Sequence, residues 1–292
     1  MTTVGDATVI VVPCFNEERR LDARAFRGLA ATGEVRLLFV DDGSTDGTGR
    51  VLADLAGTSD GIDVFTLDRN TGKAEAVRRG LLVALRGGAA TVGYYDADLA
   101  TPPEELLRLT RLLRSRPDLV GVFGSRVARL GSSIERNAWR HYLGRAYATV
   151  ASMALGITVY DTQCGAKVFR VNDAFAAALA EPFRSSWAFD VELLHRLLRG
   201  GPSAAAVPVT SFLEMPLETW FDVTGSKLRI TPALAALADL ASIARDRVRS
   251  GRSGTDGDPS ASVMVPRSSR RRDRSPGSPP GAGGRDTREE RA

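Results

Sequence analysis

The sequence has little of what a disulfide-linked, metal-cluster or membrane-spanning protein needs. Its 292 residues include two cysteines and two histidines. Cys14 and Cys164 have neither the spacing of metal ligands nor that of a disulfide framework, which is typical of a reducing compartment. No apolar run approaches the roughly 18 residues that cross a bilayer, and the N-terminus lacks a basic segment followed by an apolar one. We therefore expect a cytoplasmic protein without a transmembrane helix.

Two common nucleotide-binding loops are also missing. The segment "NTGKAEA" (70–76) lacks the upstream glycine of a Walker loop, and Ala74 stands where that loop has Ser or Thr. No Gly-x-Gly-x-x-Gly opens the first expected helix, which argues against a dinucleotide-binding fold.

The positive charge of the chain is concentrated at its C-terminal end. The formal net charge is +4 and the pI is about 9.4. Residues 251–292 hold much of the arginine, with Pro, Ser and Gly but no periodic apolar pattern, so we expect a disordered basic tail there. The tail is either a solvated segment or a contact for an anionic membrane. The rest, 1–250, is expected to form one globular domain, and nothing in it predicts nucleic-acid binding.

Apolar runs alternate with segments of helical period along the first half of the chain. Strands are expected at 7–13, 35–42, 62–68, 90–98 and 119–126, and helices at 19–30, 45–56, 72–85 and 102–115. This alternation predicts an α/β fold of parallel βαβ units with helices on both faces of the sheet. Ligands of such sheets bind at the carboxyl ends of the strands, where this sequence places its polar clusters.

The fourth expected strand ends in a pair of carboxylates. Asp96 and Asp98 are two residues apart, so in an extended chain both side chains point to the same side and can share Mg²⁺ or Mn²⁺ with substrate phosphate oxygens. Alternatively, Asp98 caps the helix that Pro102 and Pro103 begin.

Two further polar loops allow a structural and a functional interpretation. In "VDDGSTDGT" (40–48), Asp41 and its neighbours form a tight turn and a helix cap, and a carboxylate there can also accept a hydrogen bond from a uracil or guanine edge. Asn70 and Lys73 stand where a helix begins, which is a position that binds anions.

Eight motifs together resemble one family. In chain order they are "VPCFNEE", "VDDGSTDGT", "NTGKAEAVRRG", "DADLATPPEEL", "GSR", "DTQCGAKVFR", "WAFDVELL" and "GSKL". They are similar to the family-2 glycosyltransferases, and within these to the dolichyl-phosphate β-glucosyltransferases and the polyprenyl-phosphate mannosyltransferases. The resemblance extends from about Thr8 to about Arg249. It implies the GT-A fold, a Rossmann-like, mainly parallel mixed sheet covered by helices.

The resemblance also implies a donor site for a nucleotide sugar and a divalent metal. Asp98 would hold the Mg²⁺ or Mn²⁺, Asp96 would contact ribose or sugar, and Asp190 in "WAFDVELL" would hydrogen-bond sugar hydroxyls. The nucleotide sugar would be held by Pro13, Phe15, Asn16, Glu17, Asp41, Asn70 and Lys73. Charge at a helix N-terminus is the structural alternative for Asp190 and Glu192. His195 is expected on the helix surface.

The implied acceptor is a polyprenyl monophosphate, and the product is a β-linked lipid-phosphate sugar. Because the second pKa of a phosphate is near ~6, the acceptor is already largely anionic at neutral pH and needs no general base. Arg126, Arg136 and Lys227 are the expected partners of the acceptor phosphate.

A lipid acceptor requires contact with a membrane surface. Residues 137–156 place Trp139, Tyr142 and Met153 on one helical stripe near arginines, which suits an interfacial helix or a core helix. Residues 231–250 form a second expected amphipathic helix, near the C-terminus. We expect peripheral binding at the cytoplasmic face.

Other activities remain open at this point. The motifs favour glucosyl transfer from UDP-glucose, and mannosyl transfer from GDP-mannose is the alternative. A haloacid-dehalogenase-like phosphatase is a third possibility, since "YYDADLATP" superficially resembles its Asp-x-Asp motif. It is a distant one, because Ala100 stands where that motif has Thr or Val. The last possibility is a relative that binds a lipid or a nucleotide without catalysis.

Overall fold

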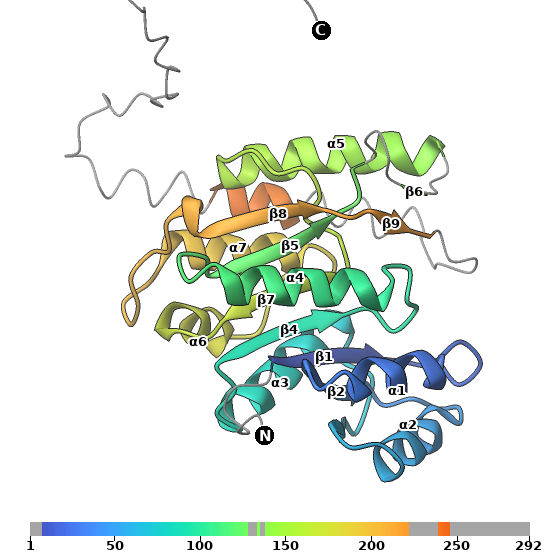
Figure 1. The fold of residues 1–292 in the computed structure, drawn as a ribbon. Coiled ribbons are helices and arrows are strands. Elements are labelled where there is room, and N and C mark those ends of the chain that lie inside the picture. The colour runs from blue at the N-terminus through green and yellow to red at the C-terminus, as the bar shows by residue number, and fades with distance from the viewer. Residues whose placement is uncertain (1–7, 128–132, 135–137, 222–238, 246–292) are drawn as a thin grey trace, which may run out of the picture. The chain divides into compact units, whose positions relative to one another are not determined.

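The computed structural model describes residues 8–127, 133–134, 138–221 and 239–245, without the side chains of 133–134 and 138–143. Its main sheet has seven strands in the order β3-β2-β1-β4-β7-β5-β8 (Figure 1). These strands are β1 (Thr8–Cys14), β2 (Val35–Asp41), β3 (Ile62–Thr66), β4 (Thr91–Tyr95), β5 (Gly121–Ser125), β7 (Ala166–Arg170) and β8 (Phe212–Pro216). A separate pair joins β6 (Ser133–Ile134) and β9 (Thr219–Trp220).

The strand directions decide which chain segments meet at the site. Strands β3, β2, β1 and β4 are mutually parallel, and β7 is antiparallel to both β4 and β5. Since two reversals restore the direction, β5 runs parallel to β4. The carboxyl ends of β1, β2, β4 and β5 and the amino end of β7 therefore lie at one edge of the sheet.

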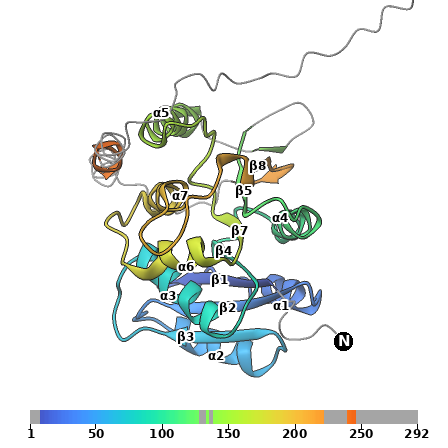
Figure 2. The same cartoon turned by 90° about the vertical axis from the view of Figure 1, so that its left-hand side faces the viewer.

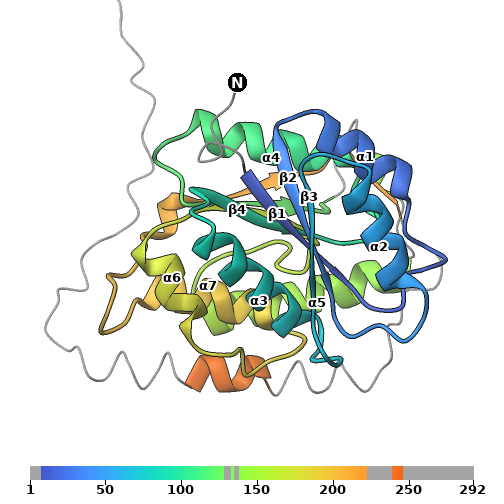
Figure 3. The ribbon, with the colours of Figure 1, turned by 90° about the horizontal axis from the view of Figure 1, so that it is seen from below.

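Helices cover both faces of the sheet, as Figure 3 shows from below. The cluster of buried apolar residues on one face includes residues of α3, α6 and α7, and the cluster on the other includes residues of α1, α2 and α4. The helices are α1 (Ala23–Ala31), α2 (Thr48–Gly57), α3 (Lys73–Arg86), α4 (Pro103–Ser115), α5 (Ala138–Leu155), α6 (Asp173–Ala180) and α7 (Phe189–Arg199), and a 3₁₀ turn spans Val209–Ser211.

Local sequence explains how these helices begin and how closely they pack. The Asp22 carboxylate caps α1 by accepting from the N–H groups of Arg24 and Ala25. Gly80 lets α3 approach the sheet, because a Cβ there would lie 2.5 Å from a Val11 methyl and 2.7 Å from a Val40 methyl.

The fold-class prediction is confirmed, with the five expected strands and four expected helices in place as β1 to β5 and α1 to α4. Strands β7 and β8 were not predicted. The tail at 251–292 lies outside the described residues, so its disorder stays a prediction. Of the expected helix at 231–250, residues 239–245 are described and are helical. None of the described helices is both long enough and apolar enough to span a membrane.

Helix α5 covers the segment for which the sequence allowed an interfacial helix or a core helix (Figure 2). Its side chains are described from residue 144 onward. Ala148, Ala151 and Ala154 are buried, whereas Met153 is 72% exposed. The described half of the helix therefore packs inward through these small residues and Leu155, and it leaves the long apolar side chain of Met153 on the outside.

Candidate active site

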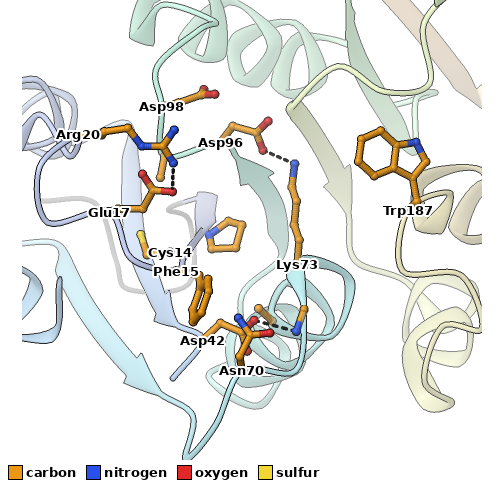
Figure 4. Close-up of a pocket in the computed structure, with 14 residues that line it drawn as sticks. Cys14, Phe15, Glu17, Arg20, Asp42, Asn70, Lys73, Asp96, Asp98 and Trp187 are labelled. Carbon is orange, nitrogen blue, oxygen red and sulfur yellow. Dashed lines mark hydrogen bonds and ion pairs between the residues drawn. The ribbon is translucent and has the colours of Figure 1, made fainter. Parts of the chain in front are cut away.

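A cavity of about 380 Å³ opens at the carboxyl ends of β1 and β4 (Figure 4). Seven predicted site residues line it, namely Pro13, Phe15, Glu17, Asn70, Lys73, Asp96 and Asp98. The other lining residues are Cys14, Arg20, Asp42, Gly72, Ala76, Ala97 and Trp187. The polar loops that the sequence placed at one sheet edge thus do meet in one cavity.

The loop after β1 contributes a carboxylate and an aromatic ring. The Glu17 backbone N–H donates to the Thr48 hydroxyl at 2.8 Å, and Glu17 Oε1 lies 2.6 Å from Nη2 of Arg20. Asn16 is not among the lining residues. Its Oδ1 accepts from Thr45 N–H at 2.9 Å, so this side chain braces the loop after β2 instead of facing the cavity.

The loop after β2 presents Asp42, and not the predicted Asp41, to the cavity. Asp41 is 4% exposed, and its Oδ1 accepts from the Ser44 N–H at 3.0 Å. Asp42 lines the cavity, and it accepts from the Thr71 N–H at 2.7 Å and the Gly72 N–H at 2.8 Å. Both carboxylates are buried, at 4% for Asp41 and 2% for Asp42, but Asp42 is the one that lines the cavity, and a nucleotide contact of Asp41 stays a prediction.

The N-terminus of α3, where Asn70 and Lys73 were expected to bind an anion, lies at the cavity. Asp42 accepts from the N–H groups of Thr71 and Gly72, which precede Lys73, the first residue of the helix. Lys73 adds a positive charge at this end of α3, and its Nζ lies 2.6 Å from Oδ1 of Asp96. Burial disfavours the charged amine, but the carboxylates of Asp96 and Asp190 outweigh burial and raise the pKa of Lys73.

Asp96 and Asp98 both face the cavity, but they are not in an extended strand. β4 ends at Tyr95, and the chain turns at once, with Leu99 at φ 54°. Helix α4 has Pro102 at its N-cap and no side-chain cap, so the alternative in which Asp98 caps this helix is wrong. Burial and the neighbouring charge of Asp96 raise the pKa of Asp98. A cation at this position would relieve both effects.

Asp190 has other partners than those expected from the sequence. Its Oδ1 lies 2.6 Å from Nζ of Lys167, accepts from the Tyr94 hydroxyl, and does not line the main cavity. Burial, and then the charge of Asp190, raise the pKa of Tyr94 well above its ordinary value, so the hydroxyl stays protonated and donates. Glu192 is 1% exposed and accepts from the N–H groups of Arg184 and Ser185.

The prediction for His195 was wrong. This side chain is 6% exposed and therefore lies inside the fold, not on the helix surface.

Arg126 is held by a carboxylate of the chain itself. Its Nε and Nη2 lie 2.6 and 2.8 Å from the two oxygens of Asp161, and its backbone N–H donates to the same group at 2.9 Å. Burial opposes ionisation of Asp161, but the Arg126 charge and hydrogen bonds lower its pKa to about 2. Arg126 does not line the cavity, and Arg136 and Lys227 lie outside the described residues.

The sequence did not single out Arg20 or Trp187, and Asp42 was considered only as a neighbour of Asp41 in "VDDGSTDGT". Arg20 follows the Asn-Glu-Glu motif by two residues, and Trp187 opens the "WAFDVELL" motif, so a signal was present for both. In Figure 4, Trp187 lies across Lys73 from Phe15.

The chain resembles known proteins over most of its length. Residues 9–174 match the family model described as glycosyl transferase family 2. Polyprenol monophosphomannose synthase of Mycolicibacterium smegmatis is 30% identical over 224 residues, 76% of this chain and 83% of that relative. Human dolichyl-phosphate beta-glucosyltransferase is 31% identical over 241 residues, 75% of this chain and 68% of that relative.

Solved structures share the fold at lower identity. Glucosyl-3-phosphoglycerate synthase from Mycobacterium tuberculosis, in complex with phosphoglyceric acid, aligns with a TM-score of 0.58 at 19% identity over 82% of this chain and 81% of that chain. The same enzyme with Mn²⁺, uridine-diphosphate and phosphoglyceric acid gives a TM-score of 0.57 at 19% identity, covering 82% and 79%. Taken with the family model and the two relatives, the likeness shows that this chain belongs to glycosyl transferase family 2 and has the GT-A fold.

Proposed function

We propose that the protein transfers a hexosyl group from a nucleotide sugar to a polyprenyl monophosphate, giving a β-linked lipid-phosphate sugar. The observation that carries this proposal is the meeting of Lys73, Asp96 and Asp98 in one cavity beside Phe15 and Asp42. The names of the relatives supply the acceptor class, because they include polyprenol and dolichyl-phosphate sugar transferases.

The nucleoside would lie at the Phe15 end of the cavity. Phe15 offers an apolar ring against a base or ribose, and Asn70 and Glu17 offer polar groups nearby. Asp42 Oδ2 accepts one N–H in the structure, from Gly72, and its second lone pair can accept from a base N–H. Lys73 supplies the positive charge for the diphosphate, and in doing so it exchanges part of its contact with Asp96 for the phosphate oxygens.

The two carboxylates at the end of β4 fit a divalent cation. Asp98 is half-buried beside Asp96, and its raised pKa shows that a negative charge at this position is unfavourable without a cation. Mg²⁺ and Mn²⁺ are bound by a few carboxylates together with substrate phosphate oxygens, which matches a pair and not a cage. When bound, such a cation would neutralise charge on the leaving nucleoside diphosphate.

The transfer would be one displacement at the anomeric carbon. An oxygen of the acceptor phosphate forms the new bond to C1 while the bond from C1 to the diphosphate oxygen breaks, which inverts an α-linked donor to a β-linked product. No residue has to remove a proton, because a phosphate monoester is largely ionised at neutral pH. Arg126, with part of its hydrogen bonding taken by Asp161, would contribute donors to the acceptor phosphate together with Arg136 and Lys227.

The proposal also covers the identity of the donor sugar and the location of the protein in the cell. UDP-glucose is the favoured donor and GDP-mannose the alternative, since the relatives include both glucosyl and mannosyl transferases. Peripheral binding at the cytoplasmic face of a membrane would bring the lipid phosphate to the cavity. The exposed Met153 and Tyr160, at 72% and 61%, are apolar side chains that could enter a lipid surface.

A donor screen tests the proposal directly. The full-length protein is incubated with polyprenyl phosphate, MnCl₂ and either UDP-glucose or GDP-mannose, and the lipid product is identified by mass spectrometry, with its anomeric form assigned by NMR. We expect a β-linked lipid-phosphate hexose from one donor. An α-linked product would contradict the single displacement, and turnover of neither donor would contradict the proposed activity.

A further inference from the structure

Gly165 lies directly against the first carboxylate of the Asp-x-Asp pair. Strands β4 and β7 are antiparallel, with Tyr95 paired to Ala166, so the residues just beyond this pair face each other. The N–H of Asp96 donates to the carbonyl oxygen of Gly165 at 2.9 Å. The "DTQCGAKVF" motif therefore meets the "DAD" motif through the backbone of these two residues.

The side chain of Asp96 occupies the space that a side chain at Gly165 would take. A Cβ at residue 165 would lie 2.1 Å from Oδ2 of Asp96 and 2.2 Å from its Cγ. Gly165 is not among the glycines with positive φ, so its backbone conformation is open to other residues. Glycine is needed at residue 165 because the Asp96 carboxylate fills the space of a side chain there, and not because of the backbone conformation.

With Oδ2 over Gly165, the other oxygen of Asp96 points at Lys73. Oδ1 lies 2.6 Å from the Lys73 Nζ, and Figure 4 shows the two side chains meeting in the cavity. Asp96 is a short side chain whose position depends mainly on rotation about its Cα–Cβ bond. A methyl group at residue 165 would therefore turn the carboxylate away from its place and from Lys73.

Gly93 in the same pair of strands provides a contrast. A Cβ there would lie 2.5 Å from the carbonyl oxygen of Lys167 and 2.8 Å from a methyl of Ile10. Backbone cannot rotate away as a carboxylate can, so an added methyl at Gly93 strains the sheet itself. An added methyl at Gly93 would therefore disturb the fold, whereas an added methyl at Gly165 would displace the side chain of Asp96.

We propose that Gly165 is a positioning residue for the donor site, whose missing side chain seats the Asp96 carboxylate beside Lys73 and toward the nucleotide and its cation. This inference rests on the donor site proposed above. It assigns the glycine of "DTQCGAKVF" a role that acts through Asp96 and not through direct contact with the substrate.

The test compares nucleotide binding with stability in matched variants. UDP and GDP, each with MnCl₂, are titrated by calorimetry into the full-length wild type and into Gly165→Ala and Gly93→Ala. Since substitutions behind metal-site ligands typically cost about 10- to 100-fold in affinity, we expect Gly165→Ala to lose that much with a small change in melting temperature. Gly93→Ala should lose more thermal stability and, where folded, keep its nucleotide affinity.

A double-mutant cycle separates positioning from general damage. In an Asp96→Ala background there is no carboxylate to displace, so adding Gly165→Ala should change nucleotide affinity by less than about twofold. Equal losses in both backgrounds, or wild-type affinity in Gly165→Ala, would overturn the role of Gly165 while leaving the donor site standing. If the wild type bound neither nucleotide, or if Asp96→Ala bound as the wild type does, the donor site itself would be refuted.

Discussion

Lys167 and Asp190 form an ion pair inside the fold, and removing one partner should destabilise the protein far more than removing both. The two side chains are 4% and 7% exposed, and their charged atoms are 2.6 Å apart. The same ammonium group donates to the Cys164 carbonyl at 2.5 Å, and the Tyr94 hydroxyl donates to Asp190. Lys167→Met would leave the Asp190 charge buried with Tyr94 as its remaining partner in this group.

The expected magnitude follows from the burial of the pair. Breaking a buried ion pair from one side costs roughly 3–5 kcal/mol, whereas replacing both charges by neutral groups is often close to neutral. At a urea m-value of about 3 kcal/mol/M, Lys167→Met should lower the unfolding midpoint by about 1 to 1.7 M. The double variant Lys167→Met/Asp190→Asn keeps an acceptor for Tyr94 and should recover most of this loss.

Urea unfolding followed by circular dichroism at pH 7 measures these differences. Arg36→Met is the matched control, because Arg36 and Asp63 form an exposed pair at 2.9 Å with side chains 39% and 58% exposed. That pair should contribute about 0–1 kcal/mol. If Lys167→Met shifts the midpoint no more than Arg36→Met does, the buried ion pair is not what holds Asp190 in place.

Two more outcomes are expected. Asp98→Asn should cut turnover by on the order of 100-fold or more. Its urea midpoint should stay equal or rise, because burial and Asp96 raise the pKa of Asp98 and so make its charge unfavourable in the folded state. Full activity of this variant would contradict the metal proposal. Asp161, with a pKa of about 2 beside Arg126, should stabilise the fold by about 2 kcal/mol above pH 4, a contribution that is lost as the pH falls toward 2. The check is urea unfolding of wild type and Asp161→Asn across that range, and the idea fails if the gap between them does not narrow.

The alternation of strands and helices was readable from sequence because each βαβ unit in residues 8–126 is local. The continuous apolar runs and the helical stretches lie next to each other in the chain, and their order fixes the parallel part of the sheet. The same rule placed Lys73, Asp96 and Asp98 at one edge, where the cavity is found. The rule could not decide which of the two adjacent carboxylates, Asp41 or Asp42, lines the cavity, because that depends on the turn that follows β2.

Contacts between distant segments account for the remaining differences. The contact of Asp190 with a sugar stays a prediction, but the ion pair of Asp190 with Lys167 was not expected, because the two residues are 23 positions apart and no local pattern indicates their pairing. Asp96 and Asp98 do share the cavity, but not by pointing to the same side of an extended chain as expected, because the chain turns after Tyr95. Both residues reach it through a turn that includes Leu99 at φ 54°, and positive φ at a residue other than glycine is rarely readable from sequence.

The direction of β7 explains why the residues that precede this strand lie at the edge of the sheet where the cavity is found. The rule that ligands bind at carboxyl ends assumes parallel strands, and it finds the loops after β1, β2 and β4. β7 runs the other way between β4 and β5, so its amino end reaches the edge where those carboxyl ends lie. That geometry brings Gly165 against Asp96 and lets Asp161, five residues before the strand, hold Arg126 after β5. In a mostly parallel sheet, the residues just before an antiparallel strand therefore lie at the same edge as the residues just after the neighbouring strands. In this chain we expect substitutions at 161–165 to weaken donor and acceptor binding more than substitutions at the carboxyl end of β7 do.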